Sequence, residues 1–112
     1  MKYWDIEQQG AVMIAAYNNP PTNYMVAEAT AELAELITRW REPDVRAVVL
    51  TGAVPDRYIT HYSVEELVEM GADPRALKQA AHTLIYGSHS LLRSLAYLDK
   101  PIVVGMTGDT MG

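Results

Sequence analysis

Three short segments are apolar at almost every position, and they limit the possible folds of this 112-residue chain more than any other feature. They are residues 11–17, 47–52 and 102–106. Apolar runs of this length are typical of buried strands in a parallel sheet, which is covered on both faces. Helices are the usual cover for such a sheet. We therefore expect an α/β fold in which the three segments are strands.

The sequence between these segments supplies the helices. The apolar positions between residues 24 and 41 recur at helical spacing and are Ala29, Leu33, Leu36, Ile37 and Trp40. Pro43 ends this pattern. The predicted order is strand 3–8, strand 11–17, helix 24–41, strand 47–52, helix 64–70, helix 74–95 and strand 102–106. No repeat or linker interrupts it, so we expect residues 1–112 to form a single domain.

Two patterns predict how the later helices begin. Ser63 and Glu66 match a capping box, in which the Ser63 hydroxyl accepts from the Glu66 amide and the Glu66 carboxylate reaches back. Asp73 and Pro74 are typical of a helix start. The apolar stripe of that helix is Leu77, Ala81, Leu84, Ile85, either Leu91 or Leu92, and Leu95. Because only about three helices are available, one sheet face or edge must stay bare.

Charge and composition exclude several classes of function. Nine Lys and Arg residues against fourteen Asp and Glu residues give a net charge of −5 without any basic run, which disfavours nucleic-acid binding. The absence of cysteine excludes disulfides, cysteine zinc sites and thiol nucleophiles. The apolar stretches are shorter than the roughly 18 to 20 residues of a membrane-spanning helix, and residues 1–5 lack a signal-peptide core. We expect a cytoplasmic protein without membrane insertion.

Metal, triad and nucleotide chemistry find little support. His82 and His89 lie seven residues apart on one predicted helix, with no Cys or paired acid at ligand spacing, so no metal is expected. No nucleophile elbow accompanies the Ser, His and Asp residues. Gly52 and Gly108 form neither a P-loop nor a dinucleotide-binding fingerprint. The loops at the carboxyl ends of the strands are where ligands bind in open α/β folds.

Three blocks of the sequence resemble the first half of the enoyl-CoA hydratase/isomerase, or crotonase, family. They are IAAYNNPPTN at residues 14–23, DVRAVVLTG at 44–52 and KPIVVGMTG at 100–108, in the family's order and spacing. The resemblance covers about residues 10–112, less than half of the usual family domain, and ends where the family's glycine-rich motif begins. It implies the N-terminal portion of a crotonase-like spiral of ββα units that hydrates or isomerises acyl-CoA thioesters.

The resemblance also implies which residues act. In the family, two backbone N–H groups hold the oxygen of a thioester enolate in an oxyanion hole. The first donor lies in a small-Gly-small-Asp pattern that matches Thr60, His61, Tyr62 and Ser63, which makes the backbone N–H of Tyr62 the implied catalytic group. Gly112 matches the first glycine of the run that carries the second donor. The family's acid/base carboxylates lie farther on.

The substrate-binding residues implied by the resemblance are Thr22, Arg57, Thr60, His61, Val64 and Gly112. Arg57 is the nearest cation for the coenzyme phosphates, although an ordinary loop arginine explains it equally well. Coenzyme A enters as part of the substrate, with no separate cofactor, and the resemblance implies a homo-oligomer, a trimer or hexamer. The alternative is a non-catalytic remnant that acts as an assembly module, in which His61 and Ser63, standing in place of Gly and Asp, mark a lost site.

Overall fold

The computed structural model describes the backbone of residues 1–110 and their side chains except those of residues 76, 77 and 80–85. In chain order the elements are β1 (Trp4–Gln9), β2 (Val12–Tyr17), α1 (Ala27–Trp40), β3 (Ala47–Gly52), α2 (Val64–Gly71), α3 (Pro74–Ala96) and β4 (Ile102–Gly105). Every predicted strand and helix is present. The largest shift in a boundary is at α1, which begins at Ala27 and not at residue 24.

The four strands form one sheet in the order β1-β2-β3-β4. β1 and β2 are antiparallel and are joined through Gly10, whose φ of 61° lies in the left-handed region. β2, β3 and β4 are parallel neighbours, with Ile14 opposite Val49 and Val49 opposite Val103. Parallel neighbours need crossover connections, which α1 and the α2–α3 pair supply. The α/β prediction is confirmed.

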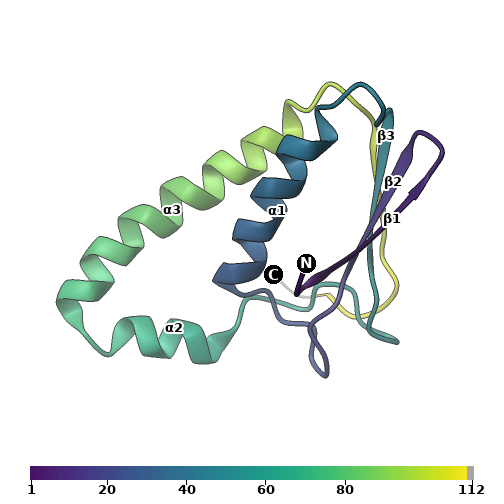
Figure 1. Cartoon of the computed structure of the whole chain (residues 1–112). Helices are drawn as coiled ribbons and strands as arrows, with labels where there is room; N and C mark the ends of the chain where they lie inside the picture. The colour runs from purple at the N-terminus through teal and green to yellow at the C-terminus, as the bar shows by residue number, and fades with distance from the viewer. Residues whose placement is uncertain (111–112) are drawn as a thin grey trace.

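The core lies between one face of the sheet and α1 (Figure 1). The predicted apolar positions of α1 are all buried there. Alternate residues of β2 and β3 face them, as the two-residue period of a strand requires. These buried strand residues are Met13, Ala15, Tyr17, Val48 and Leu50. Trp4 of β1 joins them, and its indole N–H donates to the Ala29 carbonyl at 3.0 Å.

The opposite face of the sheet has no cover among the described residues, because α1 and α3 both lie on the core side (Figure 1). Ile14 and Val49 are only half-buried, and Val103 of β4 is 60% exposed. The expectation that the apolar strands are covered on both faces is therefore wrong within residues 1–110. The expectation that one sheet face stays bare is confirmed.

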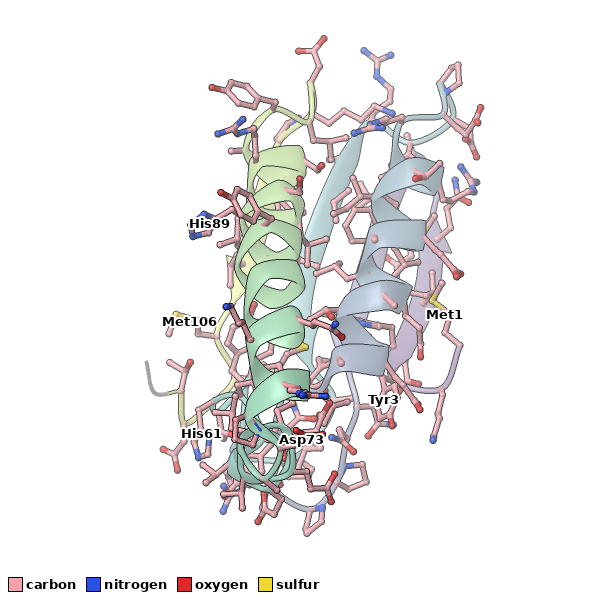
Figure 2. All side chains as sticks on the ribbon, turned by 90° about the vertical axis from the view of Figure 1, so that its left-hand side faces the viewer. Met1, Tyr3, His61, Asp73, His89 and Met106 are labelled. Atoms are coloured by element: carbon pink, nitrogen blue, oxygen red, sulfur yellow. The ribbon has the colours of Figure 1, made fainter. Side chains whose placement is uncertain are left out.

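α3 runs beside α1 in front of the sheet (Figure 2). Leu91 and Leu95 pack against the core, whereas Leu92 is 61% exposed, so Leu91 belongs to the apolar stripe. The other predicted stripe positions lie outside the described side chains and are Leu77, Ala81, Leu84 and Ile85. Within the part of the chain that the structure describes, no helix has the length and apolar character to cross a membrane.

Candidate functional site

Three loops meet at one edge of the sheet, where β2, β3 and β4 have their carboxyl ends. They are residues 18–26, 53–63 and 106–110, and α2 follows the second of them. Figure 1 shows these loops at the same end of the molecule as α2 and the start of α1. Since ligands bind at the carboxyl ends of strands in open α/β sheets, this edge is the candidate site.

The loops that follow β3 and β4 are interlocked. The Asp109 N–H donates to the Asp56 carbonyl at 3.0 Å, and the Tyr58 N–H donates to the Asp109 carbonyl at 3.1 Å. Gly108 permits this close approach, because an added Cβ would collide with the Asp56 carbonyl. Gly52 is tight in the same way, since a Cβ there would lie 2.5 Å from the carbonyl oxygen of residue 57. The two loops are therefore positioned as one unit.

The chain after β4 continues toward the loop that carries Tyr62. The Thr110 hydroxyl donates to the Ile59 carbonyl at 2.7 Å, three residues before Tyr62. Gly112, the implied glycine before the second donor, lies outside the described residues. The structure thus places Thr110, two residues before Gly112, beside the loop that carries Tyr62.

Asn23 joins the first loop to the second and is completely buried. Its side-chain oxygen accepts from the Asn19 N–H at 2.7 Å, and its amide donates to the Tyr17 carbonyl at 3.1 Å and to the Tyr58 carbonyl. Its φ of 59° is left-handed, a conformation that Asn tolerates better than most residues. Sequence reasoning placed Asn23 in a strand-ending loop but missed this linking role, for which the only local signal is the Asn-rich turn itself.

Two hydroxyl groups fix the neighbouring backbone. The Tyr17 hydroxyl donates to the Tyr24 carbonyl at 2.6 Å, and burial raises the pKa of Tyr17 to about 12, so this phenol stays protonated at neutral pH. The buried Thr60 donates its hydroxyl to the Thr22 carbonyl at 2.7 Å. The structure therefore brings the predicted residues Thr22 and Thr60 together, with the Thr60 hydroxyl engaged inside the protein.

The first loop holds the backbone on either side of Tyr62. The Met25 N–H donates to the His61 carbonyl at 2.8 Å, and the Ser63 N–H donates to the Met25 carbonyl at 2.8 Å. This parallel bridge pairs Met25 with Tyr62, so the N–H of Tyr62 points away from Met25. Among the described residues, the Tyr62 N–H has no hydrogen-bond acceptor.

The Tyr62 side chain contacts α2. Its hydroxyl donates to the Glu66 carboxylate at 3.4 Å. Burial, followed by the negative charge of Glu66 and the hydrogen bond to it, raises the pKa of the Tyr62 phenol. The phenol is therefore neutral near pH 7.

The predicted capping box forms only in half. The Ser63 hydroxyl accepts from the Glu66 N–H at 3.3 Å, as expected. The Glu66 carboxylate does not reach back to the Ser63 N–H, because that N–H donates to the Met25 carbonyl. It accepts instead from the N–H of Ala27 at 3.3 Å, at the start of α1. The N-cap residue of α1, Val26, makes no side-chain capping bond, so Glu66 caps that helix.

His61 lies between two tyrosines of the site. Its ring stacks on Tyr24 with centroids 4.2 Å apart, and its Nδ1 is 2.7 Å from the Tyr62 carbonyl oxygen. It is half-buried, and Figure 2 shows it at the end of the molecule where Asp73 begins α3. Sequence reasoning included His61 in the site but gave no reason to expect the Tyr24 partner, which lies 37 positions earlier in the chain.

Arg57 and Val64 lie on either side of Tyr62 in sequence. Arg57 is half-buried, and its guanidinium forms no ion pair with a described residue. Val64, the first residue of α2, is 53% exposed. Both side chains are open to a ligand, which is compatible with the sequence prediction without testing it.

Other features of the chain lie apart from this edge. The described residues contain no group of three His, Asp or Glu side chains that could hold a metal ion, and the side chain of His82 is outside them. A pocket of about 270 Å³ lies between α1 and α3. Its lining residues are Ala34, Ile37, Thr38, Arg41, Gly87, Ser90, Leu91 and Ser94. None of the predicted site residues is among them.

Solved structures with the same fold include enoyl-CoA hydratase/isomerases. The enzyme named so from Marinobacter aquaeolei is 16% identical with a TM-score of 0.80, over 93% of this chain and 40% of its own. The one from Mycobacterium paratuberculosis is 25% identical with a TM-score of 0.75, over 91% of this chain and 40% of its own. DspI of Pseudomonas aeruginosa is 19% identical with a TM-score of 0.77, over 96% of this chain and 42% of its own.

No protein-family model matches the chain, and no curated protein matches it in sequence. At these levels of identity the structural likeness shows the fold, which is that of the enoyl-CoA hydratase/isomerase structures, as the three sequence blocks predicted. The chain spans about 40% of the length of the structures it matches.

Proposed function

We propose that this chain, which has the fold of enoyl-CoA hydratase/isomerase structures, binds an acyl-CoA thioester and supplies one donor of an oxyanion hole. The donor is the backbone N–H of Tyr62, directed at the thioester oxygen on which negative charge develops. The reaction class is enolate chemistry on the acyl group, either hydration or isomerisation. Coenzyme A takes part as the carrier of the acyl group, and the proposal needs no separate cofactor.

The N–H of Tyr62, which has no acceptor among the described residues, is the observation that carries this proposal. The other end of the same peptide group, the His61 carbonyl, accepts from Met25 at 2.8 Å, which fixes the direction of the N–H. A donor that is already oriented needs no reorganisation when charge develops on its partner. Tyr62 also directly precedes Ser63, the N-cap of α2, and a helix N-terminus favours nearby negative charge.

The position of the chain after β4 is consistent with a second oxyanion-hole donor close to Tyr62. The resemblance puts the second donor next to Gly112, and the contact between Thr110 and Ile59 brings the preceding segment to the Tyr62 loop. The resemblance puts the acid/base carboxylates after Gly112, so Glu66 is given no chemical role and caps α1 instead. The alternative of a non-catalytic module is not favoured, because Ser63 still caps α2 despite replacing Asp.

Two substitutions of Tyr62 test the donor. Tyr62→Phe removes only the hydroxyl, whereas Tyr62→Pro removes the backbone N–H. In a protein that also carries the family's second donor and acid/base carboxylates, we expect Tyr62→Phe to retain most of the hydration of a four-carbon 2-enoyl-CoA. Tyr62→Pro should lose on the order of 10²-fold or more, the usual value of one oxyanion-hole donor. Circular dichroism shows whether Tyr62→Pro is folded. Equal losses in both variants would assign the effect to the phenol and contradict the proposal.

Arg57 tests the coenzyme end of the site. A guanidinium bound to a phosphate makes strong, charge-assisted hydrogen bonds, so the protein should prefer an acyl-CoA to the matching acyl-pantetheine, and Arg57→Ala should reduce that preference by about tenfold or more. The measurement is calorimetric titration with both ligands. Arg46→Ala is the matched control, because Arg46 is exposed at the opposite end of β3. An unchanged preference in Arg57→Ala would remove Arg57 from the site.

A further inference from the structure

We propose that His61 is a positioning residue that holds the Tyr62 N–H in place for the thioester oxygen. The inference rests on the proposed function and deepens it. It gives a role to the His61 side chain, at a position where the resemblance expects glycine, a residue without a side chain.

The contact between His61 and Tyr62 determines where the ring carries its hydrogen. Nδ1 lies 2.7 Å from the Tyr62 carbonyl oxygen. A carbonyl oxygen only accepts hydrogen bonds, so Nδ1 must be protonated and must donate. The ring also stacks on Tyr24 at 4.2 Å between centroids with an interplanar angle of 29°, which limits its rotation. Nδ1 is therefore held on the Tyr62 carbonyl by packing as well as by the hydrogen bond.

Two peptide groups flank Tyr62, and within the described part of the chain only one of their polar atoms has no partner. The His61 carbonyl accepts from Met25, and the Ser63 N–H donates to Met25. The Tyr62 carbonyl accepts from the His61 ring. The Tyr62 N–H alone has no acceptor among the described residues. Three bonds thus fix the direction of the fourth group, and a side chain makes one of them.

Loss of the His61 side chain would release one side of this arrangement. The 62–63 peptide would then be held through its N–H alone, and it shares the Cα of Tyr62 with the peptide that carries the donor. Greater freedom there reduces the polarisation that the donor imposes on a bound carbonyl. The proposed phosphate contact, Arg57, is separate from this arrangement, so the affinity for the coenzyme should change much less.

Direct chemistry at the other ring nitrogen is the competing explanation. Nε2 of His61 makes no hydrogen bond to a described residue. The acids that follow it in sequence, Glu65 and Glu66, are engaged elsewhere, with Ser63 and with Ala27. The variants must therefore separate a role of Nδ1 from a role of Nε2.

Three substitutions make that separation. His61→Asn places an amide nitrogen where Nδ1 stands, His61→Gln places one near Nε2, and His61→Leu has neither at a similar size. Each variant is titrated with butyryl-CoA labelled with ¹³C at the thioester carbonyl, and both the dissociation constant and the carbonyl chemical shift of the bound ligand are measured. The shift moves downfield as the carbonyl is polarised.

We expect the wild-type protein and His61→Asn to show the downfield shift, and His61→Gln and His61→Leu to lose most of it. Their dissociation constants should rise by about fivefold or less, the value of one ordinary hydrogen bond. His89→Ala, an exposed position on α3, should match the wild type. Circular dichroism reports folding, and the Asn and Gln pair decides if His61→Leu does not fold.

Two results would overturn the role of His61 alone. A full shift in His61→Leu would show that the side chain does not position the donor, and a shift kept by His61→Gln but lost by His61→Asn would assign the effect to Nε2. Two other results would overturn the proposed function and this inference together. One is the absence of a downfield shift when the ligand binds the wild-type protein, and the other is a downfield shift that persists in Tyr62→Pro.

Discussion

Asn23 makes three side-chain hydrogen bonds from a completely buried position, and we expect its replacement to destabilise the protein. Asn23→Ala leaves the Asn19 N–H and the Tyr17 and Tyr58 carbonyls without this partner and puts a residue less suited to left-handed φ at 59°. The expected loss in free energy of unfolding is about 2–3 kcal/mol. Asn23→Gly removes the same bonds without the conformational cost, so its free energy of unfolding should lie between those of the wild type and Asn23→Ala. Urea unfolding measures all three, and an Asn23→Ala protein as stable as the wild type would contradict this role.

Residues of the site could be predicted from sequence only where a motif identifies them. The resemblance to the family's small-Gly-small-Asp pattern points to Tyr62, and the block at residues 14–23 and the cap at Ser63 indicate the loops around it. The contacts that orient Tyr62 come from Met25 and from the Tyr24 and His61 pair, which meet only in the folded chain. No local pattern encodes such pairing, so sequence reasoning missed it. Gly112 lies outside the described residues and stays a prediction.

At the scale of elements, α1 depends on a side chain from another helix. Val26 gives it no side-chain cap, and both carboxylate oxygens of Glu66 lie 3.3 Å from the Ala27 nitrogen. We expect Glu66→Ala to lower the free energy of unfolding by about 1 kcal/mol, the usual value of a helix cap. Chemical unfolding measures this free energy. Glu69→Ala is the control, because Glu69 is an exposed acid on α2, the helix that also carries Glu66. Equal effects of the two substitutions would mean that Glu66 does not act as a cap.

The elements themselves were largely predictable, because their causes are local. Continuous apolar runs, a 3.6-residue apolar period and the prolines indicate where strands and helices lie. The capping box was half wrong for a tertiary reason, since Met25 takes the Ser63 N–H and leaves Glu66 for α1. The prediction that both faces of the sheet are covered was wrong for one face within the described residues, because an apolar strand predicts burial but does not identify the element that provides it.

At the scale of the whole molecule, the open face of the sheet carries a row of apolar side chains. Ile14, Val49 and Val103 are paired across three neighbouring strands, so they lie side by side on this face. Val12, Ala16 and Ala47 extend the row along β2 and β3. Within the described residues nothing covers these side chains, and β4 is the last strand at its edge of the sheet. Contiguous exposed apolar surface of this kind is typical of an interface.

We therefore expect the protein to associate with itself at micromolar concentrations, because a parallel sheet needs cover on both faces and an unpaired strand edge recruits another chain. Light scattering measures the mass in solution. Val49→Lys puts a charge at the centre of the apolar row and should shift the mass toward the monomer. Leu92→Lys is the matched control, because Leu92 is exposed on α3, away from this face, and it should leave the mass unchanged. If Val49→Lys keeps the mass of the wild type, association does not use the open face. A wild-type monomer that unfolds cooperatively would show that one covered face is enough to stabilise this sheet.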